Sequence, residues 1–151
     1  MNKNEALKKL ATLEEDTAKL RKIIEESENQ KITDKIKNIN DIYNYLGVTE
    51  EDIIPYKYPK TKKHFRANAF AKIECIIEVY NEGTILDWSN SNQYKYLPYF
   101  KKATSGGGWV YDYCDSYYFV TFCSVGLYYK SSELAINAGN KFIDIYNDFL
   151  G

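Results

Sequence analysis

The sequence predicts an α+β protein: an N-terminal coiled-coil helix, a helical segment, and a small antiparallel β-sheet with a C-terminal helix packed on it. Three observations predict this class. Helical spacing of apolar residues dominates the first half, aromatic and β-branched residues dominate residues 94–130, and helical spacing returns after Ser131. A chain of 151 residues, 44% of them hydrophobic, can form one domain with an appendage. We therefore expect an arm at residues 1–30 and a domain at residues 31–151.

The arm is expected to be one long helix, because residues 4–30 contain neither Gly nor Pro and are rich in Ala, Leu, Glu and Lys. With Lys3 at position a of a heptad, positions a and d form a narrow apolar seam, which is typical of a coiled coil. That seam consists of Ala6, Leu10, Leu13, Thr17, Leu20 and Ile24. We predict a homodimer or higher homo-oligomer, held together by Leu10, Leu13, Thr17, Leu20 and Ile24.

Charges beside this seam indicate a parallel arrangement of the copies. In a parallel pair, each g position meets the e position five residues on in the other copy. Lys9 then meets Glu14, and Asp16 meets Arg21, so both contacts are attractive. The alternative is a helix that packs against the body of its own chain, since an isolated helix of this length is marginally stable.

Helices are also expected between the arm and the sheet. The first has an apolar face that ends before Gly47 and consists of Ile36, Ile39, Ile42, Tyr43 and Leu46. Thr49, followed by three acidic residues, begins a short turn that Pro55 ends. A longer helix from about Lys62 to Asn81, closed by Gly83, has an inner face of Phe65, Ala69, Ile73, Ile76, Ile77 and Tyr80.

The second half of the chain predicts strands. Residues 94–103 are expected to form an edge strand, because Pro98 excludes a central one. A Ser-Gly-Gly-Gly turn follows, and then residues 109–114 and 117–130 are expected to be two strands joined across Asp115-Ser116. The strand at 117–130 is apolar on both faces and is therefore expected to be central. A final helix, capped by Ser131 or Ser132, should turn five residues inward: Leu134, Ala138, Phe142, Ile145 and Phe149.

The loop WSNSNQYKYLPYF at residues 88–100 is the first candidate binding surface, because five of its thirteen residues are aromatic. We expect Trp88, Tyr96 and Phe100 to anchor this loop to the core. By strand alternation, the outward residues that contact a partner are then Gln93, Tyr94, Lys95 and Tyr99. The 15 tyrosines of the chain suit such interfaces, although an AT-rich coding sequence explains them equally well.

Basic residues mixed with aromatic ones form a second candidate surface. The segment YKYPKTKKHFR at 56–66 contributes Lys57, Lys62, Lys63 and Arg66 to partner binding. If it lies beside QYKYLPYFKK at 93–102, the two segments make one patch despite a formal net charge of −1. Aromatic platforms interleaved with cations hold single-stranded nucleic acid, which makes a nucleic-acid or nucleotide ligand the alternative to a protein partner. The neutral balance argues against a protein that grips duplex DNA by its phosphates.

Reactive chemistry is not indicated. The only histidine is His64, and no GxSxG motif accompanies it. One His and three scattered Cys do not make a zinc site, and SGGGWV lacks the Lys of a phosphate-binding loop. Asp112 and Asp115 are interpreted as ordinary strand and turn acids. We therefore expect no enzyme activity, metal or cofactor. The odd cysteine count, a charged N-terminus and the absence of a long apolar run predict a cytoplasmic protein with reduced thiols.

From Thr33 to Leu150 the chain resembles small accessory proteins of phages and integrated elements of gut-type bacteria. Those proteins share a helix that ends in an Asn-Glu-Gly turn, a Trp-containing loop, and a final strand that passes into a helix. The residues here that carry the resemblance are Asn81-Glu82-Gly83, Trp88, Gln93-Tyr94-Lys95-Tyr96, Pro98, Phe100, Lys130-Ser131, Glu133-Leu134-Ala135, Phe142 and Ile145-Tyr146. The arm at residues 1–30 lies outside it.

This resemblance implies a function through binding. Accessory proteins of this kind, anti-CRISPR proteins among them, inhibit host defences without an active site. We therefore predict a non-enzymatic protein that binds and inhibits a host defence or CRISPR nuclease complex in the cytoplasm of the bacterial host, with the arm multiplying its contacts. The alternative is a protein that binds nucleic acid or a signal nucleotide, and a structural or assembly role is a third interpretation.

Overall fold

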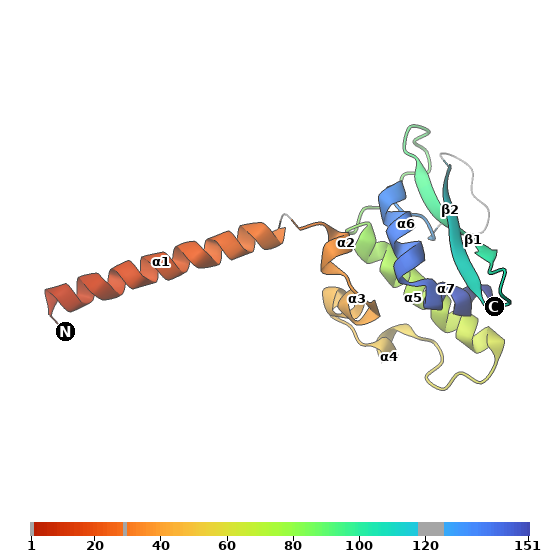
Figure 1. Cartoon of the computed structure of the whole chain (residues 1–151), viewed down its shortest axis with the longest axis horizontal. Coiled ribbons are helices and arrows are strands. Elements are labelled where there is room, and N and C mark those ends of the chain that lie inside the picture. Colours follow the sequence, from red (N-terminus) through yellow and green to blue (C-terminus); the bar gives the residue numbers. More distant parts are fainter. Residues whose placement is uncertain (1, 29, 118–125) are drawn as a thin grey trace. The chain divides into compact units, whose positions relative to one another are not determined.

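The structure is a computed structural model that describes residues 2–28, 30–117 and 126–151. These residues form seven helices and a two-stranded antiparallel sheet, which confirms the α+β class (Figure 1). The chain divides into two compact units, Met1–Lys31 and Ile32–Gly151. The first unit is a single helix, α1 (Lys3–Glu28), as its composition predicts. None of the described helices is both long and apolar enough to cross a membrane.

The second unit begins with two short helices where the sequence predicts one. These are α2 (Ile32–Lys35) and α3 (Ile39–Leu46). Asn38 separates them, because its side chain accepts a hydrogen bond from the Asn40 amide at 2.8 Å and caps α3. Gly47 ends α3 in the left-handed conformation with φ of 69°, as predicted. Ile36 lies between the helices and is nevertheless buried in the core.

Helix α4 (Glu50–Ile53) and the longer α5 (Lys62–Tyr80) follow. The Asp52 carboxylate accepts hydrogen bonds from the Thr49 amide and hydroxyl, which confirms the predicted capped start. Of the predicted inner face of α5, Ala69, Ile73, Ile76, Ile77 and Tyr80 are buried. Phe65 is a wrong prediction, because it lies in the first turn of α5 and its side chain is 44% exposed.

The sheet is a hairpin of β1 (Lys95–Lys102) and β2 (Trp109–Tyr117) joined through the glycine-rich turn. The predicted turn at Asp115-Ser116 is wrong, because both residues continue β2 and pair with β1. A register shift between Tyr99 and Phe100 puts one extra residue on β2. Residues 118–125 of the predicted central strand lie outside the described residues.

After the hairpin, the described chain resumes at residue 126 without a regular strand. Tyr129 makes an isolated antiparallel bridge to Tyr96, with N–O distances of 2.8 and 2.9 Å in the two directions. This bridge lies on the edge of β1 opposite to β2, since β1 pairs with β2 through its other edge. Pro98 sits within β1, as expected for a sheet with so few strands.

Two helices, α6 (Ser132–Lys141) and α7 (Ile143–Leu150), replace the single predicted one and cover one face of the hairpin (Figure 1). Ser131 caps α6, as predicted, and Phe142 forms the break between the helices. A Cβ at Gly139 would lie 2.9 Å from Tyr111 and 3.0 Å from Pro98. The absence of a side chain at this position therefore lets α6 approach the hairpin closely.

The core is rich in tyrosine, and most of the buried hydroxyls find partners inside it, whereas that of Tyr43 has no hydrogen-bond partner among the described residues. Tyr80 packs edge-to-face against Tyr129 and Phe142. The Tyr129 and Tyr146 hydroxyls are 2.9 Å apart, and the Tyr80 hydroxyl donates to Asn137 at 2.8 Å. These bonds offset the cost of burying the hydroxyls, which for an unpaired group is about 1–3 kcal/mol.

Three asparagines join the irregular segments to this core by hydrogen bonds to the backbone. Asn68 of α5 accepts from the Tyr56 amide and donates to its carbonyl, at 3.0 and 2.8 Å. Asn81 donates to the Tyr128 carbonyl and accepts from the Lys130 amide. Asn147 of α7 accepts from the Trp109 amide and donates to its carbonyl. Each side-chain amide thus bonds to backbone groups as a neighbouring strand would. It satisfies N–H and C=O groups that a helix or a sheet would otherwise pair. 

Candidate functional site

Helix α1 carries the first candidate surface, an exposed apolar stripe. Six of its large apolar side chains are each between 53% and 63% exposed: Leu7, Leu10, Leu13, Leu20, Ile23 and Ile24. Four belong to the predicted seam, whereas Leu7 and Ile23 widen it on the e and g sides. A stripe of this size on one helix is unfavourable in water.

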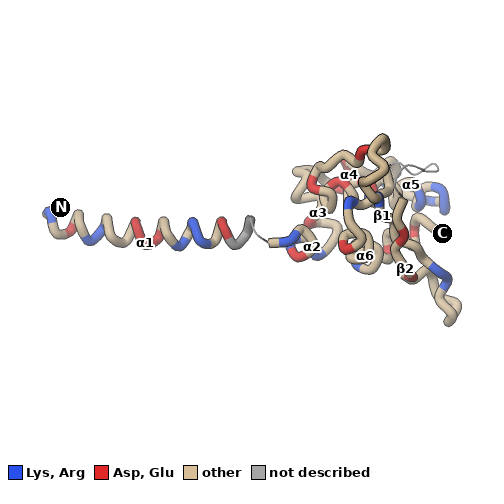
Figure 2. Tube along the Cα trace, turned by 90° about the horizontal axis from the view of Figure 1, so that it is seen from above, with Lys and Arg blue, Asp and Glu red and all other residues tan. Residues whose placement is uncertain are grey.

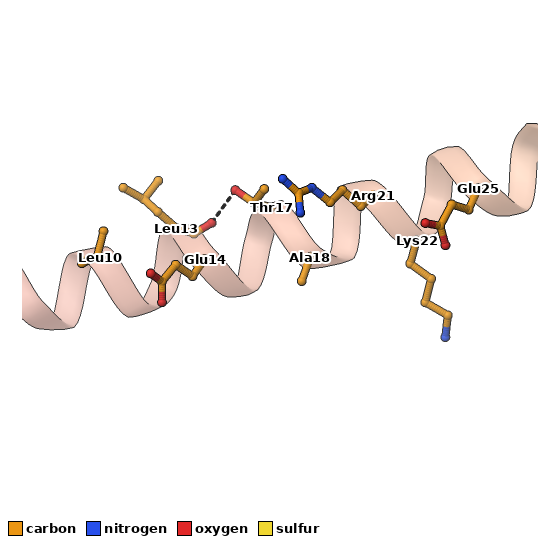
Figure 3. A pocket seen from close by; sticks show the side chains of 8 residues that line it. All are labelled: Leu10, Leu13, Glu14, Thr17, Ala18, Arg21, Lys22 and Glu25. Atoms are coloured by element: carbon orange, nitrogen blue, oxygen red, sulfur yellow. Dashed lines mark hydrogen bonds between the residues drawn. The ribbon is translucent and has the colours of Figure 1, made fainter.

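A shallow hollow runs along this same helix, between two rows of side chains (Figure 3). One row holds Leu13, Thr17 and Arg21, and the other holds Glu14 and Ala18. The Thr17 hydroxyl turns back and donates to the Leu13 carbonyl at 2.7 Å, so that it presents its methyl group to the seam. Small residues at 17 and 18 leave space between larger neighbours, which is the shape that accepts a side chain of a second helix.

Lys95 is the clearest correction among the predicted site residues. It was expected to face outward, but its side chain is fully buried. Its ammonium group donates to the carbonyls of Asp87, Asn90 and Gln93, at 2.5, 3.2 and 2.7 Å. The loop before β1 folds over this end of the strand and wraps the cation in its own backbone. Lys95 therefore positions the loop and is not available to a partner.

Some of the remaining residues of that loop anchor it to the rest of the unit, and others are exposed. Trp88 packs edge-to-face on Tyr128, with ring centroids 5.1 Å apart, and the Lys95 ammonium lies 5.3 Å from the Trp88 ring centroid. Gln93 is half-buried, and its side-chain oxygen accepts from the Asp87 amide. Tyr94 is 50% exposed and is the outward residue of this end.

Tyr99 lies on the hairpin face turned away from α6 and α7. Its ring stacks on Tyr113 at 4.8 Å, and its hydroxyl lies 2.7 Å from that of Tyr117. This hydrogen bond raises the pKa of Tyr99, with burial as the second cause. Tyr113 is 49% exposed, so the stacked pair gives the hairpin a flat aromatic surface.

The basic segment at 56–66 is only partly free for binding. Lys57 pairs with Glu51 at 2.7 Å, and His64 stacks on Tyr56 with ring centroids 4.1 Å apart. Lys62 and Lys63 are exposed in the first turn of α5, where cations oppose the helix dipole. Within the described part of the chain, neither makes an ion pair with a described acid.

Arg66 joins this segment to the end of α7. Its Nε donates to the Phe149 carbonyl at 2.9 Å, which satisfies a carbonyl of the last turn of α7. Lys102, from the end of β1, reaches the Gly151 carbonyl at 3.5 Å and lies 4.3 Å from the Trp109 ring centroid. The basic ends of α5 and β1 therefore meet around α7, and Figure 2 shows lysines and arginines on both sides of the chain end.

The predicted patch is therefore split. Lys62, Lys63 and Arg66 lie at the hairpin end that contains Lys102. Gln93 and Tyr94 lie at the other end of β1, about 25 Å away for a strand of this length. The alternation rule placed Lys95 and Tyr99 on one face correctly, but it contained no signal for the loop that covers Lys95.

Sequence reasoning missed an apolar groove on the second unit. Ala67, Phe70 and Ala71 lie on the side of α5 that faces away from its core residues, between Ile53 and Phe149. The Phe70 and Phe149 ring centroids are 5.9 Å apart. The signal was present in the sequence, because apolar residues occupy both sides of this helix and not one.

Thiols and metal ligands are not gathered into a reactive centre in the described ranges. Burial raises the pKa of the Cys75 and Cys114 thiols, which disfavours the nucleophilic thiolate. Cys123 lies outside the described residues. Across residues 2–28, 30–117 and 126–151, no cluster of three or more His, Cys, Asp or Glu could hold a metal ion.

The comparisons with known proteins add no relative. No protein family, no curated protein and no solved structure matches this chain. The resemblance to phage accessory proteins therefore stays a prediction from the residues quoted for it.

Proposed function

We propose that this protein is a non-enzymatic binding protein that self-associates through α1 and presents several copies of its α+β unit to a partner. The observation that carries the proposal is the apolar stripe of α1. Burial of a Leu or Ile side chain contributes about 1.5–3 kcal/mol. Six such side chains, each more than half exposed, therefore favour association strongly. The attraction of Lys9 for Glu14, and of Asp16 for Arg21, supports a parallel pair.

Self-association holds a second copy of the α+β unit close to the first. Once one α+β unit of the pair has bound its partner, the second unit binds the next site at a high effective concentration. Avidity is then about 10²–10⁴ higher than the affinity of a single unit, provided that the geometry permits both contacts. The resemblance of residues 33–150 to phage accessory proteins makes a host defence nuclease complex the partner to test first. Occlusion of that complex is the proposed mode of inhibition.

Sedimentation equilibrium tests the association. We expect the unmodified chain to associate in a concentration-dependent manner, and the double variant Leu13→Glu with Leu20→Glu to be monomeric, because it places charges in the seam. The matched control is Ile85→Glu, since Ile85 is 91% exposed and lies in the second unit. A monomeric unmodified chain, or a double variant that associates as before, contradicts the proposal.

A cysteine variant tests the parallel arrangement. Leu10→Cys places a thiol near one end of the seam, where only a parallel, in-register pair brings two copies of residue 10 within disulfide distance. We expect a covalent dimer on non-reducing gels after mild oxidation. The unmodified chain controls for Cys75, Cys114 and Cys123. An antiparallel pair would give no covalent dimer above that control.

Nucleic-acid binding is the second candidate, and the cations around the end of α7 favour it. Its signature is binding of a labelled single-stranded oligonucleotide that weakens steeply with salt. Replacement of Lys62 and Lys63 by Ala should then reduce the salt dependence. An affinity pull-down from host lysate, with and without nuclease treatment, distinguishes the candidates: a host nuclease retained after the treatment supports the first.

A further inference from the structure

Helices α4, α5 and α7 form an apolar groove with a cationic rim on the second unit. The side chains that line it include the small ones of Ala67 and Ala71, which we call its floor, and the larger ones of Ile53, Phe70 and Phe149, which we call its walls. Phe70 is 36% exposed, although it packs against Phe149. The groove is open along its length, and the side chains that face it are almost all apolar. An exposed hollow of this composition is typical of the surfaces that bind another protein chain.

The rim of the groove is positive. Lys63 and Arg66 line it, and both come from the first turns of α5. The Arg66 side chain is fixed in place by the bond from Nε to the Phe149 carbonyl. Its remaining guanidinium N–H groups are oriented by this bond, and the 3.5 Å contact with the Leu150 carbonyl uses only one of them. Lys63 makes no ion pair with an acid in the described ranges.

The surroundings reinforce this positive charge. Lys62 precedes Lys63 in the same exposed turn, and the N-terminal end of the α5 dipole adds to both. No acidic residue lies in the first turn of α5 to balance them. In a chain whose formal net charge is −1, this is a local excess of cations beside an apolar surface. Like charges in this position cost stability, and a ligand of opposite charge removes that cost.

We propose that the groove binds an amphipathic acidic segment of a partner protein, with its apolar side chains over Ala67 and Ala71 and its carboxylates against Lys63 and Arg66. The small floor residues permit close approach of a helix, and Ile53 and Phe149 flank the apolar face of that helix. The apolar floor favours peptide side chains over a phosphate backbone. This inference names the chemistry of the partner and goes beyond the self-association of α1, which it does not require.

Fluorescence anisotropy with the full chain tests the groove. The probe is a labelled amphipathic helical peptide with Leu and Phe on one face and Asp and Glu on the other. The comparison probe carries Lys at each acidic position, and a labelled single-stranded oligonucleotide is the third. We expect the acidic peptide to bind and the other two to bind at least about tenfold more weakly. Equal binding of the basic peptide, tighter binding of the oligonucleotide, or no binding of the acidic peptide overturns the proposal.

Two pairs of variants locate the binding. Ala71→Trp fills the groove without removing a contact, and we expect it to weaken binding of the acidic peptide by more than about tenfold. Its control, Ile136→Trp, places the same side chain on exposed α6 and should change nothing. Lys63→Glu should weaken binding by roughly fivefold or more, and Lys62→Glu, with the same change in net charge, by less. Unchanged binding of Ala71→Trp overturns the assignment to this groove.

Amide NMR shifts provide a readout that does not depend on the variants. Addition of the acidic peptide to the unmodified chain should shift the amides of Ala67, Phe70 and Ala71 and leave that of Ile136 unchanged. Shifts confined to other elements overturn the proposal. Because the double variant of α1 keeps the groove, peptide binding by that variant separates a failure of the groove from a failure of self-association.

Discussion

Helix α1 and the α+β unit use the same apolar residue types in opposite ways. In the α+β unit, Ile42, Ile73 and Ile76 are almost completely buried. In α1, Leu13 and Ile24 are more than half exposed, although they follow an equally regular helical pattern. The pattern alone thus predicts a helix in both places. In the α+β unit the apolar face packs against the chain itself, whereas for α1 we propose that a second copy of the chain covers it.

The largest expected effect is on the free energy of unfolding, and it should follow from a change in the core of the α+β unit but not from one in α1. Ile73→Ala removes buried groups from the core and should lower the free energy of unfolding of the α+β unit by about 2–5 kcal/mol. Leu13→Ala should leave that transition unchanged and weaken self-association. Chemical denaturation followed by tyrosine and tryptophan fluorescence measures the first effect, and sedimentation measures the second. Loss of the α+β transition in Leu13→Ala would show that the two units depend on each other.

Lys95 should give the next largest effect. Lys95→Met keeps the length of the side chain but removes the donor to three carbonyls, so we expect a loss of about 3 kcal/mol in the free energy of unfolding. The fluorescence of Trp88, which packs beside this lysine, should change as the loop opens. The control is Lys62→Met, which alters an exposed lysine. A stable Lys95→Met with unchanged fluorescence would contradict the structural role of this residue.

Asn147 should matter less than Lys95 but more than an exposed asparagine. Asn147→Ala leaves the amide and carbonyl of Trp109 without their partner and should lower the free energy of unfolding by about 2 kcal/mol. Asn140→Ala is the matched control, because within the described part of the chain the Asn140 side chain bonds only to the Ile136 carbonyl of its own helix. Equal thermal stabilities of the two variants would show that the bonds to Trp109 contribute little.

The smallest effect concerns pH. Hydrogen bonds from the hydroxyl and amide of Thr49 lower the pKa of Asp52, and Ser89 lowers that of Asp87 in the same way. A carboxyl whose pKa is lowered in the native state stabilises the folded protein at pH values above its pKa in the unfolded chain, about 3.9. This stabilisation is lost as the pH falls through the native pKa. Stability should therefore decrease below about pH 4. Asp52→Asn should make the decrease shallower in thermal melts taken across the acid range; an unchanged slope would contradict this origin.

Local signals predicted much of the fold. Gly47, Thr49 and Ser131 mark element ends through bonds within a few residues, and a sequence reveals such bonds directly. The failures involve partners far along the chain. Asn68, Asn81 and Asn147 bond to backbone groups between 12 and 49 residues away, and nothing in the local pattern distinguishes them from loop asparagines. Phe65 and Asp115-Ser116 were misassigned because packing and pairing overrode local preference.

The candidate surfaces differ in the same way: some depend on local sequence signals, and others depend on residues that are distant in the sequence. The seam of α1 depends on periodicity and charge order, which the sequence contains in full. The apolar groove depends on the ends of three helices that meet in space, and no spacing rule brings Ile53 and Phe149 beside Phe70. The split of the basic patch has the same cause, because Arg66 and Lys102 are neighbours only through the last turn of α7.

The enclosure of Lys95 has a consequence for chemical labelling. Amine-directed reagents reach exposed lysines such as Lys62 without hindrance, whereas the Lys95 ammonium lies beneath the backbone of its own loop. Its acylation should therefore be slow and should report each transient opening of residues 87–93. Mass spectrometry of the peptide that contains Lys95 would thus show whether a bound partner slows or accelerates the opening of that loop.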